Sequence, residues 1–338
     1  MKVIKYCSEF QSEWNTFLEN ARNATFLFDR NFMEYHSTRF HDHSLIIKDD
    51  NGKMLALMPA NITDENILIS HQGLTYGGLV VRKGKKLLHT IDYFSKLLKY
   101  LNDNEIETLV YKEIPAFYND IPFDEQQYVF FLLKAELIRR DTVSVIKNGS
   151  RPPYQRRRIR SINRAKKIGV EIRNDNNFDD FWNLVLMPNL QKRHGVNPAH
   201  SLDEIKHLHS LFPDNIKQFN AYWKGEIMAG ATIFEMQSVA HAQYSSGSDE
   251  GKKNGSLDLL FDTLISRIYA QKNYFDFGNS NELDGLKINK GLIDWKEGFG
   301  ARTCSQNFYR IKTSNYVLLK QVINSDQEVS SDYSSMEW

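Results

Sequence analysis

The chain carries the same order of predicted elements twice, and this order limits the folds that it can adopt. In the second half, runs of apolar residues bounded by turn residues predict three strands, then a helix and one more strand. These elements span residues 219–223, 226–235, 239–244, 257–271 and 274–277. Three consecutive strands with short connections form an antiparallel meander, whereas a doubly wound sheet needs crossover helices. The second half therefore predicts an α+β domain.

The first half has a similar rhythm. It opens with a short strand and a helix that places Phe10, Trp14 and Phe17 at helical spacing. The turn Asp50-Asn51-Gly52 predicts a hairpin between two of the strands that follow. Further strands are predicted at residues 44–47, 53–58, 67–70, 106–111 and 128–133, with a helix at residues 87–101.

The two halves predict an α+β fold with two domains in tandem. A length of 338 residues suits two domains that each bury a core. We expect the first domain at residues 1–150 and the second at residues 151–325. The second opens at Arg151-Pro152-Pro153 with a strongly basic helix. Residues 326–338 are expected to form a disordered tail.

Composition narrows the class of protein. Hydrophobic residues make up 41% and charged residues 25%, as in soluble globular proteins. The 43 Lys and Arg nearly balance the 42 Asp and Glu, so any binding of a polyanion depends on a local patch. No basic leader with an apolar stretch and no run of membrane-spanning length is present, which predicts a cytoplasmic location. Two cysteines, Cys7 and Cys304, exclude a disulfide framework and a cysteine-based zinc site.

No metal is expected. The loose histidine groups, His36, His41 and His43 in the first half and His200, His207 and His209 in the second, lack the spacing of metal ligands. The sequence also has no nucleophile elbow, Walker loop or Rossmann glycine fingerprint.

One lysine stands out near the C-terminus. Lys296 lies between Trp295 and the segment Gly298-Phe299-Gly300. Glycines let the backbone approach a ligand, and Trp295 and Phe299 can hold water away from a cation. Lys296 is therefore the main catalytic candidate, and the alternative is a solvated lysine beside a core aromatic pair.

The predicted helix after residue 155 is strongly basic. Residues 151–167 contain eight Lys or Arg and no Asp or Glu. Arg156, Arg160, Arg164 and Lys167 lie on neighbouring turns of one face. This face predicts contact with a polyanion, for which we select Arg157 and Arg160, and a solvated surface is the alternative.

These features resemble the GNAT (acyl-CoA N-acyltransferase) fold. The resemblance rests on the meander, the segment 250–256 that opens a helix, and the strand 274–278. The whole chain is similar to the FemAB-like branch, which carries two such domains with mixed central sheets. The basic helix and the segment 295–300 are the most specific matching parts.

The resemblance implies transfer of an acyl or aminoacyl group to an amine. The donor would be acyl-CoA or aminoacyl-tRNA, without a metal. The acceptor would be a nucleotide-linked or lipid-linked amino sugar of a cell-surface polysaccharide, or a peptidoglycan precursor. A non-catalytic protein that binds a phosphorylated glycan or RNA is a third possibility.

The resemblance also implies site residues. In relatives that use acyl-CoA, backbone N–H groups before the central helix bind pyrophosphate, and Lys252, Gly255 and Ser256 occupy that segment here. Lys and Leu replace two residues of that motif, at positions 252 and 257. Lys296 would stabilise the oxyanion or the leaving group.

The acceptor amine must be positioned and deprotonated. Asp276 and Asp294 are candidates for this role, and Tyr244 or His241 could reach the cleft from the strand at residues 239–244. Turn formation at the aspartates and core packing at Tyr244 and His241 are the alternatives.

Overall fold

The computed structural model describes residues 1–119 and 121–323. The described chain divides into two units. Unit 1 contains Met1–Ala24, His36–Ile138 and the chain from Asn307 onward, and unit 2 contains Thr25–Tyr35 and Arg139–Gln306. The expected tail at residues 326–338 lies outside the described residues.

The unit boundaries differ from the expected division at residue 150. Strand β9 (Glu136–Lys147) runs through the change of unit between Ile138 and Arg139. Charged residues interrupt the apolar alternation at the start of β9, so no strand is predicted there. The chain also returns to unit 1 within β17 (Arg302–Lys312).

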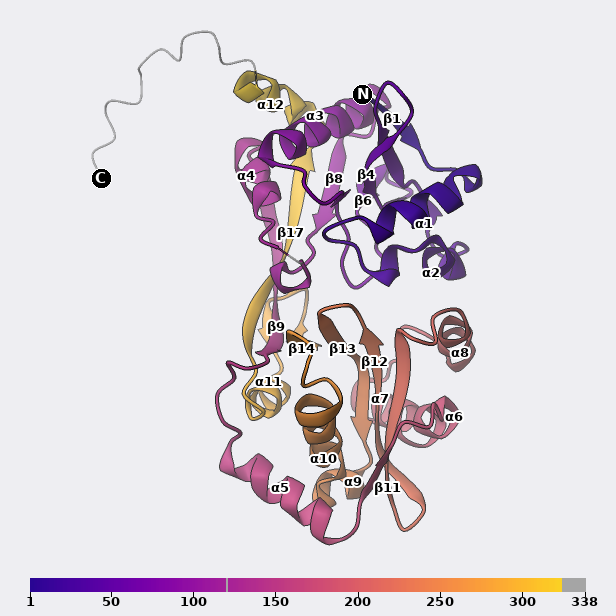
Figure 1. The fold of residues 1–338 in the computed structure, drawn as a ribbon, viewed down its shortest axis with the longest axis vertical. Coiled ribbons are helices and arrows are strands. Elements are labelled where there is room, and N and C mark those ends of the chain that lie inside the picture. The colour runs from indigo at the N-terminus through magenta and orange to yellow at the C-terminus, as the bar shows by residue number, and fades with distance from the viewer. Residues whose placement is uncertain (120, 324–338) are drawn as a thin grey trace, which may run out of the picture. The chain divides into compact units, whose positions relative to one another are not determined.

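Unit 1 has two sets of strands and a helical layer (Figure 1). One antiparallel sheet has the order β1-β3-β4-β7, and the other set has the order β17-β8-β6-β5-β2, in which β6 and β8 are parallel. The strands are β1 (Lys2–Lys5), β2 (His41–Asp42), β3 (Leu45–Lys48), β4 (Met54–Met58), β5 (Asn61–Ile62), β6 (Ile67–Ile69), β7 (Val80–Val81) and β8 (Thr108–Lys112). The helices are α1 (Gln11–Glu19), α3 (Leu87–Asp103), α4 (Glu125–Leu132) and α12 (Tyr316–Ile323).

Helix α3 forms the centre of the unit 1 core. Its apolar face places Phe94, Leu97 and Leu101 against the strands, at the spacing that an amphipathic helix requires. Helix α4 replaces the strand that the sequence predicted at residues 128–133. A short, continuous apolar run fits a buried strand or a helix equally well, and here α4 packs against α3.

Unit 2 is built on one mixed sheet with the order β10-β11-β12-β13-β14-β9. All neighbours are antiparallel except β13 and β14, which are parallel. The strands after β9 are β10 (Glu171–Arg173), β11 (Ile216–Trp223), β12 (Glu226–Glu235), β13 (Val239–Gly247), β14 (Tyr274–Asn279), β15 (Asn281–Glu282) and β16 (Lys287–Ile288). The helical segments are α2 (Arg30–Met33), α5 (Arg156–Lys167), α6 (Phe178–Asp180), η5 (Phe181–Leu186), α7 (Met187–His194), α8 (Leu202–Leu211), α9 (Asp249–Asn254), α10 (Ser256–Thr263), η6 (Leu264–Ile268) and α11 (Lys290–Glu297).

Helices cover both faces of this sheet (Figure 1). Alternate residues of β12 explain the two layers, because side chains of a strand point to opposite faces in turn. Ala229 and Ala231 belong to the core cluster under α10, which also packs against α5. Gly230 faces η5, where a Cβ would lie 2.3 Å from the Phe181 ring. Small residues on β12 therefore let both helical layers approach the sheet.

Candidate functional site

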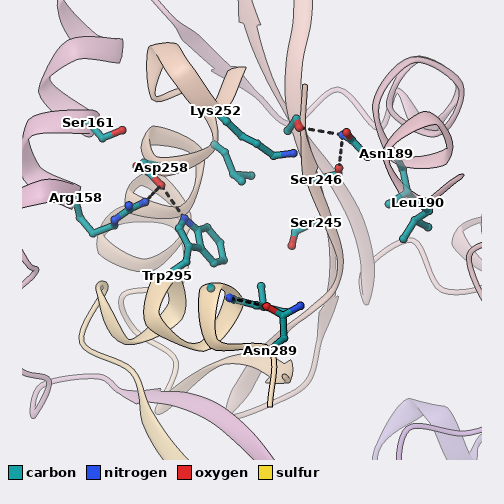
Figure 2. A pocket seen from close by; sticks show the side chains of 15 residues that line it. Arg158, Ser161, Asn189, Leu190, Ser245, Ser246, Lys252, Asp258, Asn289 and Trp295 are labelled. Atoms are coloured by element: carbon teal, nitrogen blue, oxygen red, sulfur yellow. Dashed lines mark hydrogen bonds and ion pairs between the residues drawn. The ribbon is translucent and has the colours of Figure 1, made fainter. Parts of the chain in front are cut away.

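Unit 2 contains a pocket of about 600 Å³, which we call the β13 pocket. This volume lies within the range of small-molecule sites. The pocket is lined by the end of β13 and by residues of α5, α7, α9, α10 and α11 (Figure 2). Its lining includes Arg158, Asn189, Ser245, Ser246, Gly247, Lys252, Asp258, Asn289, Leu292 and Trp295.

The pocket begins where β13 and β14 diverge. The two parallel strands pair only from Val239–Tyr274 to His241–Asp276. Beyond this point β13 continues to Gly247 and pairs only with β12 among the described residues. Alternate N–H and C=O groups of a strand point to its two edges, so the second edge of β13 presents backbone donors and acceptors. This edge can pair with an extended ligand that contains amides.

A charged cluster forms one wall of the pocket. Arg158 Nη1 lies 2.5 Å from Asp258 Oδ1, which also accepts a hydrogen bond from Trp295 Nε1 at 2.8 Å. The Asp258 side chain is buried and Arg158 is mostly buried. Three helices therefore meet at one carboxylate, and this contact fixes the indole ring of Trp295 along the pocket (Figure 2).

The opposite wall is polar. The Asn189 side-chain amide donates to Ser246 Oγ and to the Gly247 carbonyl, both at 2.9 Å. The Lys252 side chain points toward this wall (Figure 2). The predicted binding residues Lys252 and Trp295 therefore both line one pocket.

Lys296 is buried, with 4% of its surface exposed, and it is absent from the lining of the pocket. Its Nζ donates to the carbonyls of Gly278 at 2.9 Å and Asn279 at 2.5 Å. These carbonyls follow a bulge in β14, where the pairing with β9 shifts register. Burial lowers the pKa of Lys296 to about 8, and the charge of Asp276 partly opposes this effect. The alternative of a solvated lysine does not hold.

Asp276 lies beside Lys296 and is 2% exposed. Its Oδ2 lies 2.7 Å from His241 Nδ1, and its Oδ1 accepts a hydrogen bond from the Gly278 N–H at 2.6 Å. The second ring nitrogen of His241 lies 3.1 Å from Gln243 Oε1. Because a carboxylate only accepts, Nδ1 carries the proton in this pair. Asp276, His241 and Lys296 thus form one buried polar cluster. The sequence predicts Lys296 and Asp276 as catalytic candidates, and His241 is the alternative to Tyr244.

The structure places Tyr244 apart from this cluster. The Tyr244 hydroxyl accepts a hydrogen bond from the His200 N–H at 3.0 Å and lies 2.6 Å from His200 Nδ1. The ring packs edge-on against Trp182 at 5.2 Å. These contacts give Tyr244 a packing role with a satisfied hydroxyl, and His241 is the strand residue that joins Asp276.

Gly255 and Ser256 do not form an open loop. Residues 249–254 form α9, and Gly255 ends α9 and begins α10 with φ of +91°. Ser256 is fully buried, and its N–H donates to Asn254 Oδ1 at 3.0 Å. A Cβ at Gly255 would lie 2.2 Å from the Ser161 carbonyl oxygen, so α5 covers this helix end. The side-chain direction at Gly255 is therefore filled by α5, and a phosphate contact at Gly255 and Ser256 stays a prediction.

The basic helix α5 has two distinct faces. Arg157, Arg158 and Lys166 form ion pairs with Asp294, Asp258 and Asp262, respectively. On the other face, Arg156, Arg160 and Lys167 are exposed and form no ion pair within the described ranges. Of the two selected arginines, Arg160 is therefore available to a ligand, whereas Arg157 is tied to α11.

Phe299 is a core residue rather than a contact for a ligand. It is fully buried and packs against Trp295 with ring centroids 5.3 Å apart and against Phe277 at 6.0 Å. Arg158, Asp258 and Asn189 line the pocket but are not predicted as site residues from the sequence. The position of Arg158 within the basic run is the one sequence feature that could have pointed to this cluster. Its partner Asp258 lies 100 residues later, too far for a local pattern to connect the two.

Two features concern metals and membranes. Across residues 1–119 and 121–323, no three His, Cys, Asp or Glu side chains gather as metal ligands would. Within the same residues, no helix combines the length and the apolar character needed to cross a bilayer.

Comparison with solved structures identifies the fold. FemX superposes with a TM-score of 0.66 at 12% identity and covers 96% of this chain and 100% of its own. L-PGS from Bacillus licheniformis gives 0.55 at 12% identity, over 94% of this chain and 95% of its own. A tandem GNAT protein from the clavulanic acid biosynthesis pathway gives 0.50 at 10% identity, over 92% and 98%. The chain has the tandem GNAT-like fold of FemX.

This FemX-like fold confirms the α+β class with two tandem GNAT-like domains and mixed sheets. A scan against models of protein families and a search of curated proteins each gave no match to the sequence. Identities of 10 to 12% establish the fold alone, so the activity must be argued from the site.

Proposed function

We propose that this protein is an N-acyltransferase and that the β13 pocket is its reaction site. It would join an activated acyl or aminoacyl group to the amine of an amino-sugar intermediate of a cell-surface polysaccharide. The observation that carries the proposal is the divergence of β13 and β14, which opens a polar pocket in a tandem GNAT-like fold. The acceptor would be nucleotide-linked or lipid-linked.

The covered start of α10 favours aminoacyl-tRNA as the donor. A pyrophosphate bound at a helix N-terminus needs free N–H groups, and at the start of α10 Ser256 is buried with its N–H donated to Asn254 Oδ1. The start of α9 carries Asp249 and Glu250, which repel phosphate. By contrast, Arg156 and Arg160 are exposed, and arginines of this kind bind the phosphates of nucleic acids.

Acyl-CoA is the second candidate donor, and the free edge of β13 favours it. The pantetheine arm of coenzyme A is an extended chain with two amides, and such a chain can pair with a strand edge. Lys252 at the wall of the same pocket could meet a phosphate. In this case side chains, rather than a helix end, would bind the charged part of the donor.

The same transfer step applies to both donors. The acceptor nitrogen forms a bond to the acyl carbon, and the bond from that carbon to the ribose oxygen or the thioester sulfur breaks. A proton leaves the amine and returns to the leaving group. Lys296 does not line the β13 pocket, so we assign it a positioning role: its N–H groups hold the Gly278 and Asn279 carbonyls. Backbone N–H groups at the free edge of β13 would donate to the developing oxyanion. His241 and Asp276 also lie outside that lining, and we assign them to holding the end of β14, where Asp276 accepts from the Gly278 N–H.

A donor assay tests the proposal. The purified protein is incubated with UDP-linked amino sugars and either a pool of charged tRNA or acetyl-CoA, and the mass of the sugar is followed. We expect a mass gain that Ser245→Trp abolishes by filling the pocket, whereas Ser210→Trp on α8 leaves it unchanged. Binding of RNA or a phosphorylated glycan without any mass gain over a broad acceptor pool would support the non-catalytic alternative and overturn the proposal.

A further inference from the structure

We propose that the hairpin of β15 and β16 docks onto a membrane surface that contains anionic lipid. Its turn exposes two large apolar side chains, Leu283 at 71% and Leu286 at 92%. Ile288 and Leu292 follow with 44% and 38% exposure. A single exposed leucine is ordinary, but four large apolar side chains within ten residues mark a contact surface.

The backbone of this turn is fixed in place. Asp284 forms an ion pair with Arg139 at 2.7 Å, and the Asn281 side chain donates to the Gly285 carbonyl at 3.2 Å. A Cβ at Gly285 would lie 2.8 Å from the Arg140 carbonyl oxygen of β9. The leucines are therefore exposed on an anchored turn rather than on a frayed loop.

The turn also has an unusual conformation. Leu283 and Asp284 both have φ of +51°, and Gly285 follows at +92°. Leucine rarely adopts a positive φ, because its Cβ then approaches the following carbonyl oxygen. Strained residues that the surrounding structure enforces concentrate at functional positions. Here the strain presents Leu283 to solvent, where it gains no packing within unit 2.

The charges beside the turn fit an anionic surface. The acidic residues of the hairpin are matched internally, because Glu282 pairs with Lys287 at 2.7 Å and Asp284 pairs with Arg139. Lys290 is exposed at the start of α11, and that helix is joined to the basic helix α5 by the ion pair of Arg157 with Asp294. Apolar insertion with flanking Lys and Arg is the pattern of proteins that lie on membranes. A second copy of this chain would carry the same basic residues, and the like charges of the two copies would repel each other.

Docking would place the β13 pocket at the lipid surface. The hairpin leads directly into Asn289, Gly291 and Leu292, which line the pocket. A lipid-linked acceptor could then reach the pocket without leaving the bilayer. The docking surface stands independently of the proposed transfer, because it rests on the exposure, the anchoring and the charges of the hairpin.

Vesicle co-sedimentation tests the inference with the full chain. Vesicles of phosphatidylcholine alone are compared with vesicles of equal parts phosphatidylcholine and phosphatidylglycerol. We expect binding to the anionic vesicles, and we expect Leu283→Ser with Leu286→Ser to lower the partition coefficient by at least about tenfold.

Leu184→Ser on η5 is the matched control, because Leu184 is 61% exposed and does not belong to the hairpin. Lys290→Gln should weaken binding at low salt and have little effect at high salt.

Several results would overturn the inference. One is wild-type protein that stays in the supernatant with both kinds of vesicle, and another is a double variant that sediments as the wild type does. Light scattering covers the alternative occupant: a concentration-dependent dimer that the double variant loses would assign the hairpin to a second copy instead. Circular dichroism and thermal melting of each variant confirm that the exposed substitutions leave the fold intact.

Discussion

The backbone of Ser161 lies directly over Gly255, such that a Cβ at residue 255 would be 2.2 Å from the Ser161 carbonyl oxygen. Gly255 also has φ of +91°, so both space and conformation require glycine. Gly255→Ala should lower the free energy of unfolding by about 3 kcal/mol or more, measured by urea denaturation. Gly169→Ala is the control, because its φ of +81° is similar and no atom lies within 4 Å. That control should lose only about 1 kcal/mol. Equal losses would show that α5 does not cover this position.

Two ion pairs join α5 to α10 in different surroundings. Asp258, with Arg158, is buried, whereas Asp262 pairs with Lys166, which is 57% exposed. Asp258→Asn should cost about 2 kcal/mol, because it leaves the mostly buried Arg158 without its countercharge. Asp262→Asn should cost less than about 0.5 kcal/mol. Chemical denaturation of both variants makes the comparison, and the reverse order would contradict the burial of Asp258.

Lys296 should stabilise unit 2 through the carbonyls that follow the β14 bulge. Lys296→Met leaves the Gly278 and Asn279 carbonyls without this donor, and we expect a loss of about 2 kcal/mol near neutral pH. Lys296→Arg should recover little of this loss, because the guanidinium is broader than the ammonium.

The contribution of Lys296 should also depend on pH. Its pKa is about 8 in the folded protein and 10.5 without burial, so the unfolded chain binds the proton more tightly between these values. The stability of the wild type relative to Lys296→Met should therefore rise between about pH 8 and pH 10, by up to on the order of 3 kcal/mol. Urea midpoints of both proteins across this range measure the difference. A difference that stays constant would show that Lys296 keeps the pKa of a solvated lysine.

The exposed face of α5 predicts the salt dependence of nucleic-acid binding. Arg156→Gln with Arg160→Gln should weaken binding of tRNA and lower the slope of log affinity against log salt by about two units. Lys166→Gln is the matched control, because Lys166 is paired with Asp262 on the same helix. Fluorescence anisotropy over a salt series gives both slopes. If Lys166→Gln and the double variant change the slope equally, the face with Arg156 and Arg160 is only a solvated surface.

Local patterns predicted most of the elements. Ser201 and Glu204 have the sequence spacing of a capping box, and this capping box is present at the start of α8. The apolar spacing of α3 matches its buried face. The meander of β11, β12 and β13 also lies where the sequence placed it. Each of these features depends on residues within a few positions of one another, which is the range that periodicity and capping report.

The site depends on contacts that lie far apart along the chain. The partners of Lys296 are carbonyls 17 and 18 residues earlier in the chain. They lie at a bulge of β14 that no local residue pattern predicts, so the burial of Lys296 could not be predicted either. Tyr244 meets His200 across 44 residues, and this contact removes it from the cluster that His241 joins. The sequence predicts a loop at residues 248–256, yet residues 249–254 form α9, because the Ser248 side chain caps this helix by accepting from the Gly251 N–H. Tertiary packing decides these points.

The division of unit 1 between the two ends of the chain affects how a newly made polypeptide can fold. Strand β8 pairs with β17 from Thr108–Lys312 to Lys112–Phe308, and Leu319 of α12 belongs to the same core as α3. Unit 2, by contrast, has all of its residues once Gln306 has been added. During synthesis, the N-terminal segments of unit 1 therefore keep unpaired strand edges until residues 307–323 have been made. A chain truncated after residue 306 would contain a complete unit 2 and an unfinished unit 1, which limited proteolysis of the truncated chain would reveal as protection of Arg139–Gln306.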